Sequence, residues 1–349
     1  MKTNQKPILS YRRITEITLL VLCAMVPFFV GNYVKQVLLF AFLLAYLCGA
    51  WNISGGYGGL VSFGHAAFVG IGAYATTILL VYYGLPGWVG MFVGGVLSAA
   101  VGYLLSWAIC RFQVKGFYFC VSTILLAEIL MSLVIRSRYF GRGMGIPFPS
   151  VTNVFNLQFI NVEPYYYIAL LLVCIIVIIT RRIERSRLGW YLRATRQSEQ
   201  ASSALGIDVT KIKVVSMTLS AFLTGVGGGV YVLALRYCNP YDVFGLMLSN
   251  WLMAGTLLGG RGTVYGPIIG IAILTIVKEG LTFTAEMAGG LNSFALVLAV
   301  WGIILCLVAK FLPNGLGPWV QDRFNRRKHS DSINFGELSK QEDTIYVSE

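Results

Sequence analysis

Few residues in this chain could do chemistry, and most of them stand alone among apolar neighbours. The only two histidines are His65 and His329, and the charged residues inside long apolar segments are Glu128, Lys278 and Glu279. A proton relay or a metal site at His65 would need a second histidine or a nearby acid, and the sequence offers neither. The sequence therefore favours a buried, hydrogen-bonded structural role for His65.

Ionisable side chains inside apolar segments are costly in lipid and usually face a bundle interior or a pathway. We expect Glu128, at the centre of its segment, to be paired inside the bundle. We expect Lys278 to extend its ammonium group towards a membrane surface. Because Lys278 and Glu279 are adjacent on a helix and point in different directions, we do not expect them to pair with each other.

Sequence motifs of enzymes are missing from the chain. It contains no GxxxxGK[ST] phosphate loop, HExxH, GxSxG or acidic metal cluster. The seven cysteines form no CxxC pair and lie mostly in apolar segments, where they act as small packing residues. We therefore predict no catalytic, cofactor or metal site, and any use of ATP would depend on another chain.

One basic, polar stretch interrupts the apolar sequence at residues 181–213 and carries eight Lys and Arg residues. Within it, residues 198–206 (SEQASSALG) predict one short helix. Ser198 can cap its N-terminus, Glu199 suits the positive end of the helix dipole, and Gly206 fits the left-handed position after its end.

The predicted short helix has little to bury within its own chain. One small apolar face is shared by Ala201, Ala204 and Leu205. We therefore expect this face to dock into a groove of a partner protein.

The composition places these elements in a membrane. The chain has 349 residues, of which 56% are hydrophobic and 12% charged. Apolar segments recur along it, so we predict an all-α integral membrane protein with about ten transmembrane helices and some broken or glycine-rich segments. The segments are 14–31, 35–52, 66–83, 88–110, 116–135, 165–180, 212–235, 246–258, 264–283 and 292–311, with 246–258 the weakest.

Lys and Arg residues set the expected orientation. Most of the 27 gather at segment ends and loops that share one side if both termini are cytoplasmic, which predicts an N-in, C-in topology. The net charge of +12 then reflects this topology and contact with anionic membrane lipids, and it does not indicate nucleic-acid binding. The first apolar segment resembles a signal peptide but is long for one, so we expect it to be retained.

The expected organisation is a single membrane domain. It consists of a basic cytoplasmic N-terminus (1–13), a transmembrane domain (14–311) and a polar cytoplasmic tail (312–349). An outer loop at 136–164 is rich in Gly and Pro. Against the orientation rule, this loop region carries Arg136, Arg138 and Arg142, which are either ordinary exceptions or a docking site for an acidic patch of an extracytoplasmic protein.

A glycine-rich stretch, 52–65, should interrupt a helix near the membrane. Irregular backbone is tolerated there only where protein buries it or where it lines a cavity. A helix restarting near Ser62 would direct its free N–H groups at such a cavity, while small residues at 66–77 favour close helix packing. The pathway or hinge residues predicted here are Asn52, Gly55, Gly56, Gly58, Gly59, Ser62 and His65.

A second glycine-rich tetrapeptide echoes this stretch. Gly55-Gly56-Tyr57-Gly58 and Gly259-Gly260-Arg261-Gly262 each precede an apolar segment. The echo is either a parallel internal repeat or a chance match between glycine-rich sequences.

Three blocks of the sequence resemble the branched-chain amino acid ABC transporter permease family. The resemblance is greatest to the M-type permease subunit of that family. The blocks are NISGGYGGLVSFGHAAFVGIGAY at 52–74, residues 181–214, and GTLLGGRGTVYGPIIG at 255–270, within a resemblance that covers residues 35–320. The family's coupling motif has Glu, Ala and a downstream Gly. Glu199, Ala201 and Gly206 match it, with Gln200 in place of an Ala and one extra residue before the Gly.

The resemblance implies an importer subunit of the bacterial inner membrane. It would pair with a second related permease, with two cytoplasmic ABC ATPase subunits and with a periplasmic or lipid-anchored substrate-binding protein. The implied substrates are the branched-chain amino acids, with urea or a short amide as the alternative within the family. An ion-coupled secondary carrier is the alternative outside it, and a membrane transferase is disfavoured because the chain is poor in catalytic residues.

Overall fold

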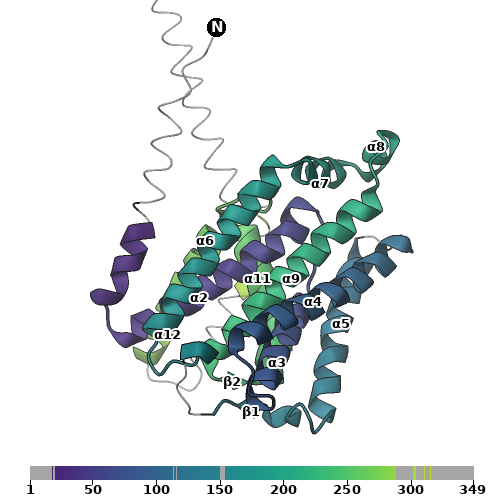
Figure 1. Cartoon of the computed structure of the whole chain (residues 1–349). Coiled ribbons are helices and arrows are strands. Elements are labelled where there is room, and N and C mark those ends of the chain that lie inside the picture. The colour runs from purple at the N-terminus through teal and green to yellow at the C-terminus, as the bar shows by residue number, and fades with distance from the viewer. Residues whose placement is uncertain are drawn as a thin grey trace, which may run out of the picture.

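The protein is built almost entirely from helices that run between two ends of the molecule (Figure 1). The computed structural model describes residues 20–112, 116–149 and 154–287, together with residues 18, 114, 302, 303, 310 and 315. The long helices are α2 (Asn32–Trp51), α4 (Gly87–Arg111), α5 (Phe117–Arg136), α6 (Glu163–Arg185), α9 (Val209–Leu235) and α12 (Gly266–Met287).

Shorter elements join these helices. A π-helical segment, Asn52–Tyr57, continues α2 without a gap. The other short helices are α3 (Ala66–Val81), α7 (Arg187–Gln197), α8 (Glu199–Ala204), α10 (Pro240–Phe244) and α11 (Leu246–Gly259), with 3-10 turns at Val26–Phe28, Arg142–Met144 and Val154–Asn156. Strands β1 (Ile146–Pro147) and β2 (Tyr237–Cys238) form one antiparallel ribbon.

Six helices within the described residues are long and apolar enough to cross a membrane. This finding fits an all-α membrane protein, but it does not reach the ten spans expected from the sequence. Two further predicted segments, 66–83 and 246–258, form the shorter helices α3 and α11. Most of segment 14–31 and nearly all of segment 292–311 lie outside the described residues.

Glycines allow three helices, α3, α4 and α9, to pack with their backbones almost in contact. A Cβ at Gly94 of α4 would lie 2.8 Å from the Cα of Gly72 on α3, and one at Gly225 of α9 would lie 2.8 Å from the carbonyl oxygen of Gly94. Such close approach is the usual way in which helices pack in lipid, where the hydrophobic effect does not drive one helix against another. These three helices form the densest part of the core.

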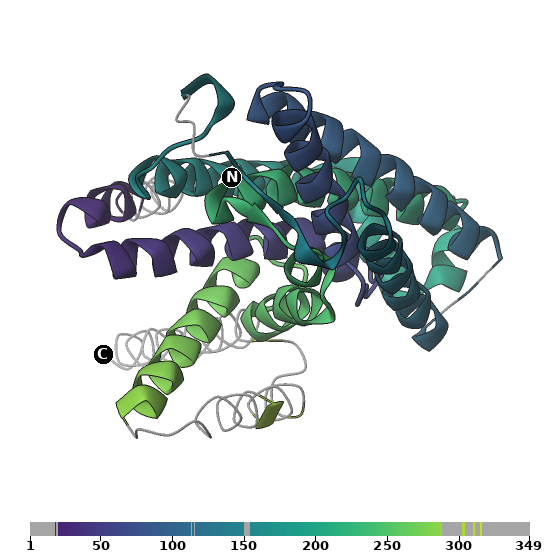
Figure 2. The same ribbon diagram turned by 90° about the horizontal axis from the view of Figure 1, so that it is seen from below.

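Several other helices pack around α2, which is the most buried of the six long helices. Helix α2 packs on α6, α9, α11 and α12, and α5 lies at the edge of the molecule against α3 and α10 (Figure 2). The C-terminal half of α2 is mostly buried, and Trp51 and Tyr46 are among the largest fully buried side chains. Helix α2 therefore connects the α3–α4–α9 core with the α11–α12 pair.

The two ends of the molecule differ in structure. One end carries α7 and α8, and the other carries the β1–β2 ribbon (Figure 1). The ribbon pairs Ile146 with Cys238 and Pro147 with Tyr237, and the amide of Phe148 donates to the carbonyl of Arg236 at 3.2 Å. These bonds attach the loop after α5 to the end of α9.

We predict that enlarging the contact point of the three core helices will destabilise the fold. In Gly225→Leu the new side chain would overlap Ser98 and the backbone of Gly94, so overpacking should lower the free energy of unfolding by about 1–3 kcal/mol or more. Thermal unfolding of the detergent-solubilised protein measures this loss. Gly280→Leu is the matched control, because a Cβ at Gly280 has no neighbour within 4 Å, and equal stability of the two variants would contradict the packing described here.

Candidate functional site

Helix α8 has a complete cap at each end. The Ser198 hydroxyl accepts a hydrogen bond from the Ala201 amide at 3.2 Å, which confirms the predicted N-cap. At the other end the Gly206 amide donates to Ser203 at 3.0 Å and the Ile207 amide donates to Ser202 at 3.1 Å. This is the Schellman pattern, and it uses the left-handed backbone of Gly206, whose φ is +80°.

The apolar face of α8 points away from the rest of the chain. Ala201, Ala204 and Leu205 are all exposed, and Leu205 retains 80% of its accessible surface. Ser202 on the opposite side is buried. The predicted small apolar face is therefore present and has no cover within the described chain.

An ion pair holds α8 against the first turns of α9. The Lys213 Nζ lies 2.6 Å from the Glu199 Oε1, and only 12% of the lysine side chain is exposed. A charge pair with one partner this buried restrains the helix more firmly than an exposed surface pair would. Glu199 thus fixes the position of α8 within its own chain.

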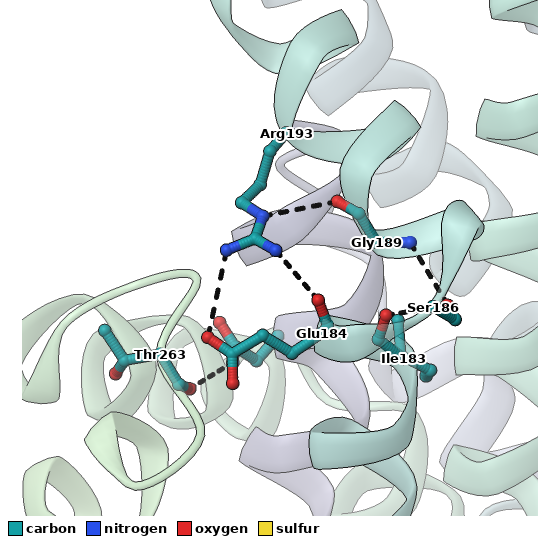
Figure 3. Close-up of polar contacts among 7 residues, drawn as sticks. Ile183, Glu184, Ser186, Gly189, Arg193 and Thr263 are labelled. Carbon is teal, nitrogen blue, oxygen red and sulfur yellow. Dashed lines mark hydrogen bonds and ion pairs between the residues drawn. The ribbon is translucent and has the colours of Figure 1, made fainter. Parts of the chain in front are cut away.

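The link between α6 and α7 is equally ordered (Figure 3). Ser186 caps α7 by accepting from the Gly189 amide at 3.3 Å and donates to the Ile183 carbonyl at 2.7 Å. Arg193 donates to the Glu184 carbonyl at 2.8 Å, and its Nη1 lies 3.9 Å from the Glu184 carboxylate. These bonds set the angle at which α7 leaves the end of α6.

Residues 52–65 form a helix break that is packed inside the protein. The backbone leaves the π-helical segment after Tyr57, turns at Gly59 with φ of +72°, and begins α3 at Ala66. We expected the restart near Ser62 with free N–H groups, and this was wrong in both respects. The helix starts four residues later, and the hydroxyl of Ser249 accepts from the Ala66 amide at 2.9 Å.

Asn52 connects the helix break to the second glycine-rich segment. Its side-chain amide donates to the Thr263 carbonyl at 2.8 Å, and its Oδ1 accepts from the Gly262 amide at 2.8 Å. A Cβ on Gly56 would lie 2.7 Å from the Gly262 nitrogen. The two echoing tetrapeptides are thus neighbours in space, and glycine at 56 is required for their contact.

Arg196, in the last turn of α7, completes this junction. Its Nη1 donates to the Gly56 carbonyl at 2.6 Å, and its Cγ would lie 3.3 Å from a Cβ on Gly59. Burial, and secondly the charge of Arg261, lower the pKa of the guanidinium, although arginine stays protonated in proteins. We call Asn52, Gly56, Arg196, Gly262 and Thr263 the junction; it joins α7, α2 and the loop before α12.

Elsewhere in the break, side chains form hydrogen bonds with buried backbone carbonyls and with His65. Ser220 of α9 donates to the Ala50 carbonyl at 2.6 Å and lies 2.9 Å from the Nε2 of His65. Trp51 donates from its indole nitrogen to the Ser62 carbonyl at 2.8 Å. His65 is fully buried and hydrogen-bonded, as expected for a structural histidine.

Some polar atoms of the break remain without a partner among the described residues. They are the Tyr57 hydroxyl, the Ser62 hydroxyl and the Nδ1 of His65, all of them buried. Each such group costs about 1–3 kcal/mol relative to a satisfied one. The polar groups of the break are therefore hydrogen-bonded at the junction, whereas these three atoms elsewhere in the break lack partners.

The three predicted docking arginines lie together at the opposite end of the molecule. Arg136 is in the last turn of α5, and Arg138 and Arg142 follow in the loop that leads to β1. All three are exposed. The same end exposes Met144, which retains 85% of its accessible surface.

The ionisable residues of the apolar segments differ from expectation. Lys278 and Glu279 pair at 3.4 Å, contrary to our prediction, because both side chains bend into one pocket beside α2 and α11. Glu128 was expected to be paired, but it lies half-buried on α5 without an ion-pair partner in the described part of the chain.

Sequence reasoning did not identify Arg196, Ser220, Ser249 or Thr263 as parts of the break. Each contacts it from a distant segment, so local patterns carried no signal for them. The echo of glycine tetrapeptides was the one sequence feature that pointed to the junction.

Comparisons with known proteins agree with this architecture. The sequence profile of the family described as "Branched-chain amino acid transport system / permease component" matches residues 20–309. The high-affinity branched-chain amino acid transport system permease protein LivM of Escherichia coli (strain K12) is 27% identical over 326 residues, which cover 86% of this chain and 74% of that protein.

More distant relatives extend the comparison. The probable branched-chain amino acid transport permease protein LivM of Methanocaldococcus jannaschii is 22% identical over 330 residues, which cover 82% of this chain and 94% of that protein. The ribose import permease protein RbsC of Escherichia coli (strain K12) is 30% identical over 130 residues, 36% of this chain and 39% of that protein. No solved structure matches the chain significantly.

A family profile that spans most of the chain, together with helices of membrane-spanning length, fixes the class of the protein. The chain belongs to the permease-component family of branched-chain amino acid transport systems and is a multi-pass permease of the bacterial inner membrane.

Proposed function

We propose that this chain is the membrane-spanning permease subunit of an ABC importer for leucine, isoleucine and valine. The names of its LivM relatives support this substrate class. Its partners are a second related permease, two cytoplasmic ABC ATPase subunits and a periplasmic or lipid-anchored substrate-binding protein. The observation that carries the proposal is α8, a doubly capped helix whose apolar face is exposed.

Helix α8 is the ATPase-coupling helix in this proposal. Its contact face is formed by Ala201, Ala204 and Leu205, while Ser198 and Gly206 cap it and Glu199 anchors it to α9. Closure of the ATPases on ATP would push α8. Because α8 and α7 are consecutive helices, the push would reach the junction through Arg196.

The helix break acts as the hinge or pathway element of alternating access. The residues assigned to it are Asn52, Gly55, Gly56, Gly58, Gly59, Ser62 and His65. Its buried polar atoms without partners support a hinge, since a second conformation can offer them the partners that this one lacks. Transport then follows from the α3–α4–α9 core rocking against the α11–α12 pair about this break.

The topology of this permease is N-in and C-in with about ten spans. Within the described residues, the six long helices and the shorter helices α3 and α11 are the candidates for these spans. This places α8 on the cytoplasmic side. Arg136, Arg138 and Arg142 then face outward as a docking site for acidic residues of the binding protein, whose affinity should fall as ionic strength rises.

Leu205→Asp should abolish uptake of leucine without loss of folding. The side chain is exposed, so a charge there costs little stability, but it would be buried when the ATPase docks. Uptake by proteoliposomes that contain the complete importer should fall by about ten-fold or more, while Leu205→Met keeps an apolar contact and should stay near wild type. Normal uptake by Leu205→Asp would remove α8 from the mechanism.

Gly56→Leu should arrest transport at the hinge. The added side chain would overlap the Asn52 amide and the Gly262 nitrogen. This overlap would push the two glycine-rich segments apart. Uptake should be lost in correctly inserted protein, whereas Gly31→Leu, at a site with no neighbour within 4 Å, should transport normally. Equal uptake by the two variants would contradict the hinge.

The same proteoliposomes separate this proposal from its rivals. An ion-coupled carrier would take up substrate with this chain alone, without ATP. A urea or short-amide permease would transport those solutes and ignore leucine. Uptake that requires ATP, all partners and a branched-chain amino acid is the result expected here.

A further inference from the structure

A pocket of about 580 Å³ opens between α2, α9, α10, α11 and α12. This volume lies within the range of small-molecule sites in proteins. Its lining includes residues of the first turn of α2 and of α10, so the pocket lies at the end of the molecule opposite α8. It is separate from the junction and from the arginines after α5.

The lining of the pocket carries charges of both signs. Lys278 and Glu279 of α12 pair there at 3.4 Å, and the Tyr33 hydroxyl donates to the Glu279 carboxylate at 2.8 Å. Asp242 of α10 adds a second carboxylate, and the Lys278 ammonium lies 6.0 Å from the centre of the Trp251 ring. Half of the Lys278 side chain and a quarter of that of Glu279 remain exposed.

Gln36, Thr275 and tyrosines also line the pocket, and the larger part of the remaining lining is apolar. It is formed mainly by Val37, Phe40, Ala41, Leu44, Leu235 and Leu248. Charged side chains inside membrane-spanning helices are costly and mark functional sites. Here an ammonium and two carboxylates sit beside a surface that suits an aliphatic side chain.

We infer that this pocket binds the zwitterion of an aliphatic α-amino acid on its way through the permease. The ligand carboxylate pairs with Lys278, and the ligand ammonium pairs with Glu279 and Asp242. The side chain of leucine, isoleucine or valine packs against the apolar part of the lining. This inference rests on the proposed function, and it adds a substrate site within this chain to the specificity of the binding protein.

The charges favour this occupant over a lipid acyl chain. An acyl chain would use only the apolar part of the lining and would make no contact with Lys278, Glu279 and Asp242 that uses their charges. A zwitterion exchanges the Lys278–Glu279 pair for two charge-assisted contacts of the same signs, and its ammonium also gives Asp242 a counter-charge.

Thiol protection in the complete importer tests the inference directly. Ala41→Cys places a reactive group on the apolar part of the lining, and its labelling by a methanethiosulfonate reagent is followed site by site with mass spectrometry. Leucine should slow labelling of A41C, and leucinamide, which lacks the carboxylate, should protect less. Labelling of Tyr83→Cys, an exposed site outside the pocket, should proceed at the same rate with and without leucine.

Charge-neutralising variants provide the second arm. In A41C combined with K278M or E279Q, the leucine concentration that protects should rise by about ten-fold or more, because each variant removes one of the charges that the zwitterion contacts. K278M should also erase the preference for leucine over leucinamide. Glu128→Gln, the same substitution on α5 outside the pocket, should leave protection unchanged.

Three results would overturn the inference: no protection by leucine, protection in the K278M and E279Q variants at the same leucine concentration as in A41C alone, or protection by added phospholipid alone. Uptake by the A41C importer is measured first. Uptake without protection refutes this site only, whereas no ATP-dependent uptake by the unsubstituted importer, for any branched-chain amino acid, refutes the proposed function.

Discussion

In a membrane every backbone polar group must be satisfied within the protein, and the structure around α2 and α3 depends on this constraint. A helix that stops inside a bundle frees amide and carbonyl groups that lipid cannot bind. Here other segments satisfy them: Ser249 accepts from the start of α3, Trp51 donates to the break, and Arg196 caps the Gly56 carbonyl. The break persists because α7, α9, α11 and the loop before α12 all converge on it.

The same constraint explains the distribution of glycine. Helices in lipid are held by close packing and short polar contacts, so small residues lie where backbones meet. Gly72, Gly94 and Gly225 serve this purpose in the core, and Gly56 serves it at the junction. The core glycines make a rigid contact. The junction glycine instead lies where two separate glycine-rich segments meet, beside the Asn52 side chain and the Gly262 amide.

Local patterns predicted the local structure. The caps of α8 and its exposed apolar face follow from residues within one nonapeptide, and they were predicted correctly for that reason. The positions of eight apolar segments were also clear, although composition alone did not separate long helices from the short α3 and α11.

Contacts between distant segments were beyond sequence reasoning. No sequence pattern near Asn52 indicates its hydrogen bonds to Gly262 and Thr263. The pairing of Lys278 with Glu279 was predicted wrongly because backbone direction on a helix does not fix where long, flexible side chains end. The mixed-charge pocket likewise depends on five helices meeting, which no single segment reveals.

We propose that Arg196 transmits movement of α8 to the helix break. The most direct test is the ratio of leucine taken up to ATP hydrolysed by the complete importer with Arg196→Met, compared with the unsubstituted chain. Assembly and ATP hydrolysis should persist while the ratio falls by about ten-fold or more, because loss of a charged hydrogen bond of this kind costs about 1.5–3 kcal/mol. An unchanged ratio would contradict the proposal.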